Sequence, residues 1–323
     1  MSDSPRESPD DSPGPVPQDP EKSLDSLVLH ATDNAVSWIT LNRPEAMNAV
    51  TWDQRERVIA LLAEASADPE VRAVVITATG RGFCAGADLR SAPGTGTGTG
   101  TAPGTGTSNA APAAPSTPAA PATPAGPAGL ANPGARVPGD VARTIRLGAQ
   151  RLISAVLDCE KPVIAAVNGT AAGIGAHLAF ACDLVLAAES AKFIEVFVRR
   201  GLVPDGGGAY LLPRLIGPQR AKELMFFGDA LTAPDAERLG LVNRVVPLED
   251  LEKTARAWSE RLATGPTRAL ALTKQLVNAS LDTDRSTAFT AEAAAQEINM
   301  TTSDAHEGVT SFVERRSPHY RGR

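Results

Sequence analysis

Short, continuously apolar runs rich in β-branched residues recur along the chain and predict buried strands. Val71 to Thr77 and Pro162 to Val167 are the clearest of these, and Asp183 to Ala188 and Phe193 to Val198 are further apolar runs. Near the start, apolar segments flank Asp33-Asn34 and predict a hairpin of Leu27 to Leu29 with Val36 to Leu41. The same chain also has helical periodicity, so we expect a mixed α/β domain.

Two amphipathic helices are predicted between the strands. Thr51 is placed to cap a helix to about Ser66, with Gln54 completing a capping box. Its expected inner face consists of Trp52, Val58, Ile59 and Leu62. We expect Asp140 to cap a second helix to Asp158, in which one apolar stripe contains Val141, Ile145, Leu152, Ile153 and Val156.

Helical spacing dominates the last third of the chain. The predicted helices are 219–227, 234–239, 248–263, 267–279, 288–300 and 304–316, the last with Ser303 as its cap. With the low-complexity segments set apart, three parts result. They are a disordered, acidic, proline-rich tail (1–23), an α/β core (24–217) interrupted by an insert (91–138), and a helical region (218–323).

The insert is distinguished by its composition. Ser91 to Ala135 contains neither a charged nor an aromatic residue and consists largely of Gly, Thr, Ala, Pro and Ser. Such a segment cannot supply a core, so we interpret it as a flexible linker. What it does to substrate access stays open.

Charge and cysteine content exclude several function classes. The 323 residues have a formal net charge of −6 and a pI near 5.4, with no basic stripe, which argues against a nucleic-acid partner. Cys84, Cys159 and Cys182 lie in or beside apolar segments without metal-ligand spacing, so we expect buried reduced thiols and no metal site. Nowhere do eighteen apolar residues follow one another, and we expect a cytoplasmic protein without a membrane segment.

Two glycine-rich turns carry the candidate chemistry. The run Pro162 to Val167 leads into Gly173-Ile174-Gly175 and an apolar helix, and Val71 to Thr77 leads into Ala78 to Arg90. A helix N-terminus presents unpaired backbone N–H groups and the positive end of its dipole. Both turns could therefore bind a developing oxyanion, although tight packing turns would have the same pattern.

Four motifs in order resemble one known family. The segments LNRPEAMNAV (41–50), TGRGFCAGADL (79–89), VNGTAAGIGAHLAFACDL (167–184) and GLVPDGGGAYLLPRLIG (201–217) are similar to the crotonase superfamily, the enoyl-CoA hydratase/isomerase family. The resemblance covers about 27–90 and 140 to the C-terminus. It implies a spiral of ββα units with a C-terminal helical oligomerisation region, a homotrimer or a dimer of trimers.

The resemblance also implies site residues. The oxyanion-hole donors would be the backbone N–H groups of Ala87 and Ile174. Hydratases of the family use two glutamates, and His177 and Phe197 stand at those positions here. Glu195 would share a strand face with Phe197, but the motif register puts Phe197 at the site.

Asp205 is the remaining acid–base candidate. It precedes three glycines in a loop where an acidic residue is the base in isomerase branches of the family, including the bacterial 1,2-epoxyphenylacetyl-CoA isomerase. A turn-stabilising aspartate would have the same sequence pattern. His177 would either assist or be a hydrogen-bonded wall residue.

The resemblance further implies that coenzyme A enters as part of the substrate, with no separate cofactor. In the family's pattern, the backbone of Ala85, Asp88 and Leu89 would bind its adenine and pantetheine, and Phe312 and Arg315 its nucleotide end. Alternatively, the segment of Phe312 and Arg315 is an ordinary cationic C-terminal turn that binds no ligand. The resemblance implies an acyl-CoA isomerase acting through a thioester enolate. An enoyl-CoA hydratase, a non-catalytic acyl-CoA-binding protein and another enolate reaction such as decarboxylation stay open.

Overall fold

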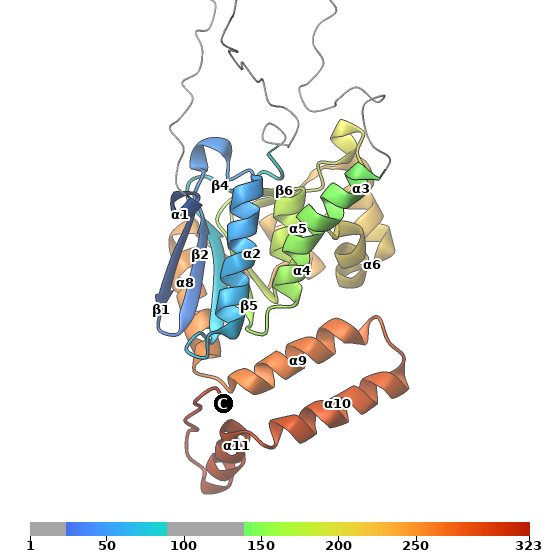
Figure 1. Cartoon of the computed structure of the whole chain (residues 1–323). Coiled ribbons are helices and arrows are strands. Elements are labelled where there is room, and N and C mark those ends of the chain that lie inside the picture. The colour runs from blue at the N-terminus through green and yellow to red at the C-terminus, as the bar shows by residue number, and fades with distance from the viewer. Residues whose placement is uncertain (1–23, 89–138) are drawn as a thin grey trace, which may run out of the picture.

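The computed structural model describes residues 24–88 and 139–323 (Figure 1). The tail 1–23, Leu89 and the insert 91–138 lie outside these residues, so the expectations for them stay expectations. The described part contains two sheets with helices around them, as the periodicity predicts.

The large sheet has the strand order β1-β2-β3-β5-β7-β10. Only the β1–β2 hairpin is antiparallel, and every other neighbouring pair is parallel. Its strands are β1 (Val28–Asp33), β2 (Val36–Leu41), β3 (Ala73–Ala78), β5 (Val163–Val167), β7 (Leu184–Ala188) and β10 (Arg244–Val246). All five β5 residues are buried, as expected of a strand covered on both faces.

The small sheet contains strands of only three residues, in the order β4-β6-β8-β9. They are β4 (Gly82–Cys84), β6 (Thr170–Ala172), β8 (Lys192–Ile194) and β9 (Ala230–Thr232). The chain alternates between the sheets, because β3, β5 and β7 belong to the large one and β4, β6 and β8 to the small one. A helix follows each strand pair, which confirms the ββα spiral.

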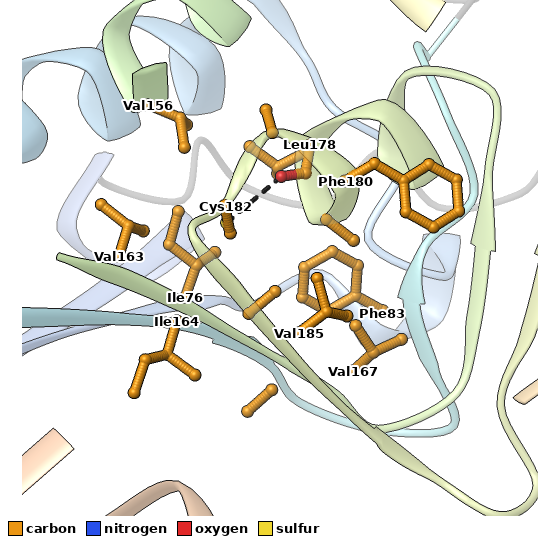
Figure 2. Packing of buried hydrophobic residues seen from close by; sticks show 14 of the residues in the cluster. Ile76, Phe83, Val156, Val163, Ile164, Val167, Leu178, Phe180, Cys182 and Val185 are labelled. Atoms are coloured by element: carbon orange, nitrogen blue, oxygen red, sulfur yellow. Dashed lines mark hydrogen bonds between the residues drawn. The ribbon is translucent and has the colours of Figure 1, made fainter. Parts of the chain in front are cut away.

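Helices cover both faces of the large sheet (Figure 1). On one side lie α2 (Trp52–Ala67), α4 (Arg151–Leu157) and α5 (Ile174–Ala181), and on the other α8 (Leu248–Ala263) packs against β2, β3, β5 and β7. All eight residues of α5 are buried. Figure 2 shows Leu178, Phe180 and Cys182 packed with side chains of the large sheet and with Phe83 of β4.

The first turns of α2 and α3 differ in part from the sequence expectations. The capping box of Thr51 and Gln54 is present, but Trp52 is 45% exposed, with the Arg55 guanidinium 4.3 Å from its ring centroid. The predicted inner-face residues Val58 and Leu62 are buried and Ile59 packs against the core, and Gln54, Leu61 and Ala65 are buried with them. Asp140 is the first residue of α3 (Asp140–Ile145) rather than its cap, which is Gly139, and Val141 is exposed.

The C-terminal region is helical, as predicted, with shifted boundaries. It contains α6 (Gly208–Phe227), α7 (Ala233–Leu239), α9 (Thr267–Ser280), α10 (Arg285–Asn299) and α11 (Ser303–Glu314), besides α8. Helix α6 begins well before the expected Gln219 and is interrupted at Gly217 (φ 77°). Thr302, not Ser303, caps α11 by accepting from the Ala305 N–H. In the described ranges no helix has both the length and the apolar character to cross a bilayer.

Candidate active site

Ala87 follows β4 and makes an isolated parallel bridge with Val50. The Val50 N–H donates to the Gly86 carbonyl at 2.8 Å, and the Asp88 N–H donates to the Val50 carbonyl at 2.9 Å. In a parallel pair the residue between two such bonds directs its own N–H to the other side. The Ala87 N–H therefore points away from Val50, and Ala87 itself is exposed.

Ile174 is the first residue of α5, so its N–H belongs to the turn that has no acceptor within the helix. Gly173 precedes it with φ 54° and ψ −124°, a conformation that side-chain-bearing residues rarely adopt. A Cβ on Gly173 would also lie 3.2 Å from Cγ2 of Val196. The sequence places this glycine where the chain must turn from β6 into the helix.

The segments of Ala87 and Ile174 are close neighbours, because β4 and β6 pair in parallel. A Cβ on Gly86 would lie 3.2 Å from the Ala172 carbonyl oxygen, and one on Gly175 would lie 2.3 Å from the Cys84 carbonyl oxygen. The glycines permit this approach of one strand end to the other. Two backbone donors placed in this way can bind an anionic oxygen.

His177 lies one helical turn after Ile174 and is fully buried. Its Nε2 is 3.0 Å from Oε2 of Glu195, which is 4% exposed, and its ring stacks on Phe197 with centroids 5.4 Å apart. Phe197, which the motif register places at the site, and Glu195 therefore both contact this ring. The strand β8 ends at Ile194, and the turn that follows brings both side chains against His177.

Asp205 lies in the loop before α6 and is half-buried. Gly206 has φ 55°, and a Cβ on it would lie 3.4 Å from the Ile174 side chain, while a Cβ on Gly208 would lie 2.1 Å from Nε2 of His177. The loop of Asp205 therefore packs against both residues. Burial raises the pKa of Asp205 above its usual range, and the charge of a protonated His177 would act in the opposite direction.

The residues expected to bind coenzyme A lie in two separate regions, Ala85 and Asp88 after β4 and Phe312 and Arg315 at the end of α11. The Ala85 N–H donates to the Met47 carbonyl at 2.9 Å and is not free for a ligand. Asp88 pairs with Arg43 at 3.0 Å, and Leu89 lies outside the described residues. Phe312 is 84% exposed on α11, and Arg315 ends that helix with φ 56°. Figure 1 places α11 below α9 and α10, with β4 and β6 toward the top, so one protomer does not bring Phe312 and Arg315 to Ala87.

The cysteines contribute no reactive group to this arrangement. Cys84, Cys159 and Cys182 are buried and unpaired, as expected. Burial raises the pKa of the Cys84 thiol to about 11 and that of Cys182 still further. Across residues 24–88 and 139–323, no three His, Cys, Asp or Glu side chains are grouped to hold a metal ion.

Sequence reasoning missed two members of the His177 environment. The motif register favours Phe197 over Glu195, and no sequence signal marks the turn after β8 that brings both side chains to His177. Gly208 belongs to a run of three glycines, and nothing in the sequence indicates that it packs against the His177 ring. No hydrophobic periodicity links Gly208 to the motif at Gly173.

Comparison with known proteins identifies the family. The family model described as "Enoyl-CoA hydratase/isomerase" matches residues 31–108 and 135–323. A probable enoyl-CoA hydratase of Rhodobacter capsulatus is 36% identical, covering 92% of this chain and 98% of the relative. The 1,2-epoxyphenylacetyl-CoA isomerase of Escherichia coli is 33% identical, over 92% and 99% of the two chains.

The fold agrees with this match. A crystal structure of a putative enoyl-CoA hydratase from Streptomyces coelicolor A3(2) superposes with a TM-score of 0.76 at 32% identity, covering 97% of this chain and 99% of that one. The alternating sheets and the helix after each strand pair are the crotonase architecture. The chain belongs to the enoyl-CoA hydratase/isomerase family.

Proposed function

We propose that the protein is an acyl-CoA isomerase acting through a thioester enolate, of the enoyl-CoA or 1,2-epoxyphenylacetyl-CoA type. The thioester oxygen would accept hydrogen bonds from the N–H groups of Ala87 and Ile174. Asp205 would remove a proton from the acyl chain, and the electron pair left behind would become the enolate. Asp205 would return the proton at another carbon, or to a ring oxygen after ring opening.

The observation that carries this proposal is the position of Asp205. Its loop packs against Ile174 and His177, next to a candidate oxyanion site, and burial raises its pKa. A carboxylate whose pKa is raised toward the working pH is a stronger base than an exposed aspartate and can also return the proton. His177 and Phe197 stand where the family's hydratases have glutamates, which disfavours activation of a water.

Hydration is the second candidate, and one observation favours it. Glu195 supplies a carboxylate that contacts His177, so an acid–base pair does exist near Ile174. Several relatives are also named as hydratases, among them the crotonyl-CoA hydratase of Syntrophomonas wolfei, which is 34% identical. A non-catalytic acyl-CoA-binding protein and a decarboxylase are further alternatives.

Assembly and coenzyme A binding belong to the same proposal. Apolar side chains are exposed along α9 to α11, including Val277, Leu281, Phe289, Ile298, Val309, Phe312 and Val313. A surface of this kind favours burial between subunits, as a homotrimer or a dimer of trimers. Phe312 and Arg315 would then bind the nucleotide end of coenzyme A at a neighbouring subunit, where an arginine suits phosphate. Light scattering after size-exclusion chromatography measures the subunit number.

The test of function is a panel of enoyl, dienoyl, epoxy and aromatic acyl-CoA thioesters, with products identified by mass spectrometry. We expect isomers of unchanged mass, and crotonyl-CoA hydration well below the ~10³ s⁻¹ of fast enzymes. A gain of 18 mass units as the main product would establish the hydratase instead. Tight binding of every thioester without turnover would establish the binding protein.

The assignment of the base is tested on the best substrate of that panel. Asp205→Asn keeps the size of the side chain but removes the base, so kcat should fall by roughly 10²–10⁴-fold with substrate affinity retained. His177→Ala should cost less. Deuterium exchange at the α- or γ-carbon shows which variant has lost proton transfer. Exchange that is lost in His177→Ala and kept in Asp205→Asn would assign the base to His177.

A further inference from the structure

His177 and Glu195 form a buried ionisable pair in which each partner leaves one polar atom without a hydrogen bond. These atoms are Nδ1 of His177 and Oε1 of Glu195. The side chains are 0% and 3% exposed, so neither atom is compensated by bulk water. A buried pair of this kind adds little to stability, and an unpaired buried polar atom is unfavourable. A purely structural role would be met better by apolar side chains of similar size.

The imidazole is fixed from several directions. Phe197 covers one face, with 13° between the ring planes. Gly208 lies against the Nε2 edge, where there is no room even for a Cβ. Oε2 of Glu195 lies 3.0 Å from Nε2, and in its ionised form this carboxylate can only accept a hydrogen bond there. With Glu195 ionised, the contact would fix both the orientation of the ring and the hydrogen on Nε2.

Two features of the surroundings oppose a charge on the ring, whereas an ionised Glu195 beside Nε2 favours one. His177 lies in the first turn of α5, and the positive end of a helix dipole disfavours a cation. A protonated ring would add a charged N–H at Nδ1, and that atom has no acceptor. In the neutral ring the same atom is a lone pair, whose missing hydrogen bond costs less.

We propose that Glu195 is a positioning residue that holds neutral His177 with its hydrogen on Nε2, so that the buried Nδ1 is left as a hydrogen-bond acceptor. Such an acceptor suits a donor that appears only during the reaction. Under the proposed function, on which this step rests, that donor is the carboxylic acid that Asp205 becomes after taking up the substrate's proton. The two carboxyl groups would then act on opposite nitrogens of one ring.

The tautomer is measured by nitrogen NMR of the ligand-free, full-length protein. The chain has four histidines, and His177 is the buried one, since His30, His306 and His319 are exposed. We expect its resonances near neutral pH to show a protonated Nε2 and an unprotonated Nδ1. In Glu195→Met the tautomers should mix or invert. Glu195→Gln should restore the wild-type pattern, because its carbonyl oxygen can accept from Nε2.

Kinetics provide the second readout. Glu195→Met should lower kcat with KM unchanged, by less than the roughly 10⁴-fold loss seen when a wrong tautomer disables a histidine that is itself the base. Glu195→Gln should recover most of it, and the exposed Glu223→Met is the matched control.

A wild-type His177 that is protonated on Nδ1, or on both nitrogens, would overturn the proposal. So would a folded Glu195→Met variant with an unchanged tautomer. Should Glu195→Met fail to fold, the wild-type tautomer still decides. This readout needs no substrate, so its outcome is independent of whether the isomerase assignment holds.

Discussion

Gly208 faces the imidazole of His177 so closely that a methyl group at its Cα would lie 2.1 Å from Nε2 and 2.5 Å from Cε1. The ring cannot move aside easily, because Phe197 and Glu195 hold it. The start of α6, the loop of Asp205 and the ring of His177 are therefore adjusted to one another. We expect a substitution at any of the three to shift the positions of the other two.

Gly208→Ala tests this relationship directly. We expect a folded protein whose turnover falls at least tenfold, about 1.4 kcal/mol in activation free energy, because the loop or the ring must shift. Gly148→Ala is the matched control, since its close neighbour is the far end of the long Arg55 side chain and not an aromatic ring. Steady-state kinetics of both variants decide, and equal turnover in the two would show that the contact is not important.

The pH dependence of kcat/KM should report Asp205. Because burial raises its pKa, the acid limb of the profile should lie above the range of an ordinary aspartate. In Asp205→Asn the residual activity should lack that limb. A limb that persists unchanged in this variant would belong to another group.

Asp205 should lower the free energy of unfolding at neutral pH. A carboxyl whose pKa is raised by folding stabilises the protein below its unfolded pKa, and this contribution is lost as pH rises through the folded pKa. Asp205→Asn should therefore melt higher than the wild type at pH 7 and equally in acid below both pKa values. Thermal scans at one protein concentration compare the two, and a lower melting temperature at pH 7 would contradict the cause given for the pKa shift.

Lys274 anchors α9 to the core through a partly buried carboxylate. Its Nζ donates to Asp183 Oδ2 at 2.8 Å and to the Val156 carbonyl at 3.0 Å. Lys274→Met should destabilise the protein by roughly 3 kcal/mol, the lower end for a broken buried pair, because Asp183 is 22% exposed. Denaturant titration measures it, with the exposed Arg238→Met expected within about 1 kcal/mol of wild type.

Deleting residues 95–133 should leave folding and assembly unchanged, because the segment contains neither charged nor aromatic residues. The melting temperature and the subunit number of the deletion variant measure this. Aggregation or loss of the melting transition would show that the segment contributes to the fold.

The sequence anticipates those features that short-range chemistry determines. The capping box at Thr51 and the buried strand β5 follow from side-chain hydrogen bonding and apolar burial over a few residues. The strand β6 was not anticipated, since three residues are too short for a periodic pattern. The contact of Glu195 with His177 joins positions eighteen residues apart through a turn, and nothing local encodes that distance.

The two candidate donors lie on opposite sides of the long insert, Ala87 just before it and Ile174 well after it. Their spacing depends on the parallel pairing of β4 with β6, not on the length of chain between them. A pair of donors positioned by sheet pairing does not require a fixed number of residues between them, so the distance between the two N–H groups does not depend on the length of the insert.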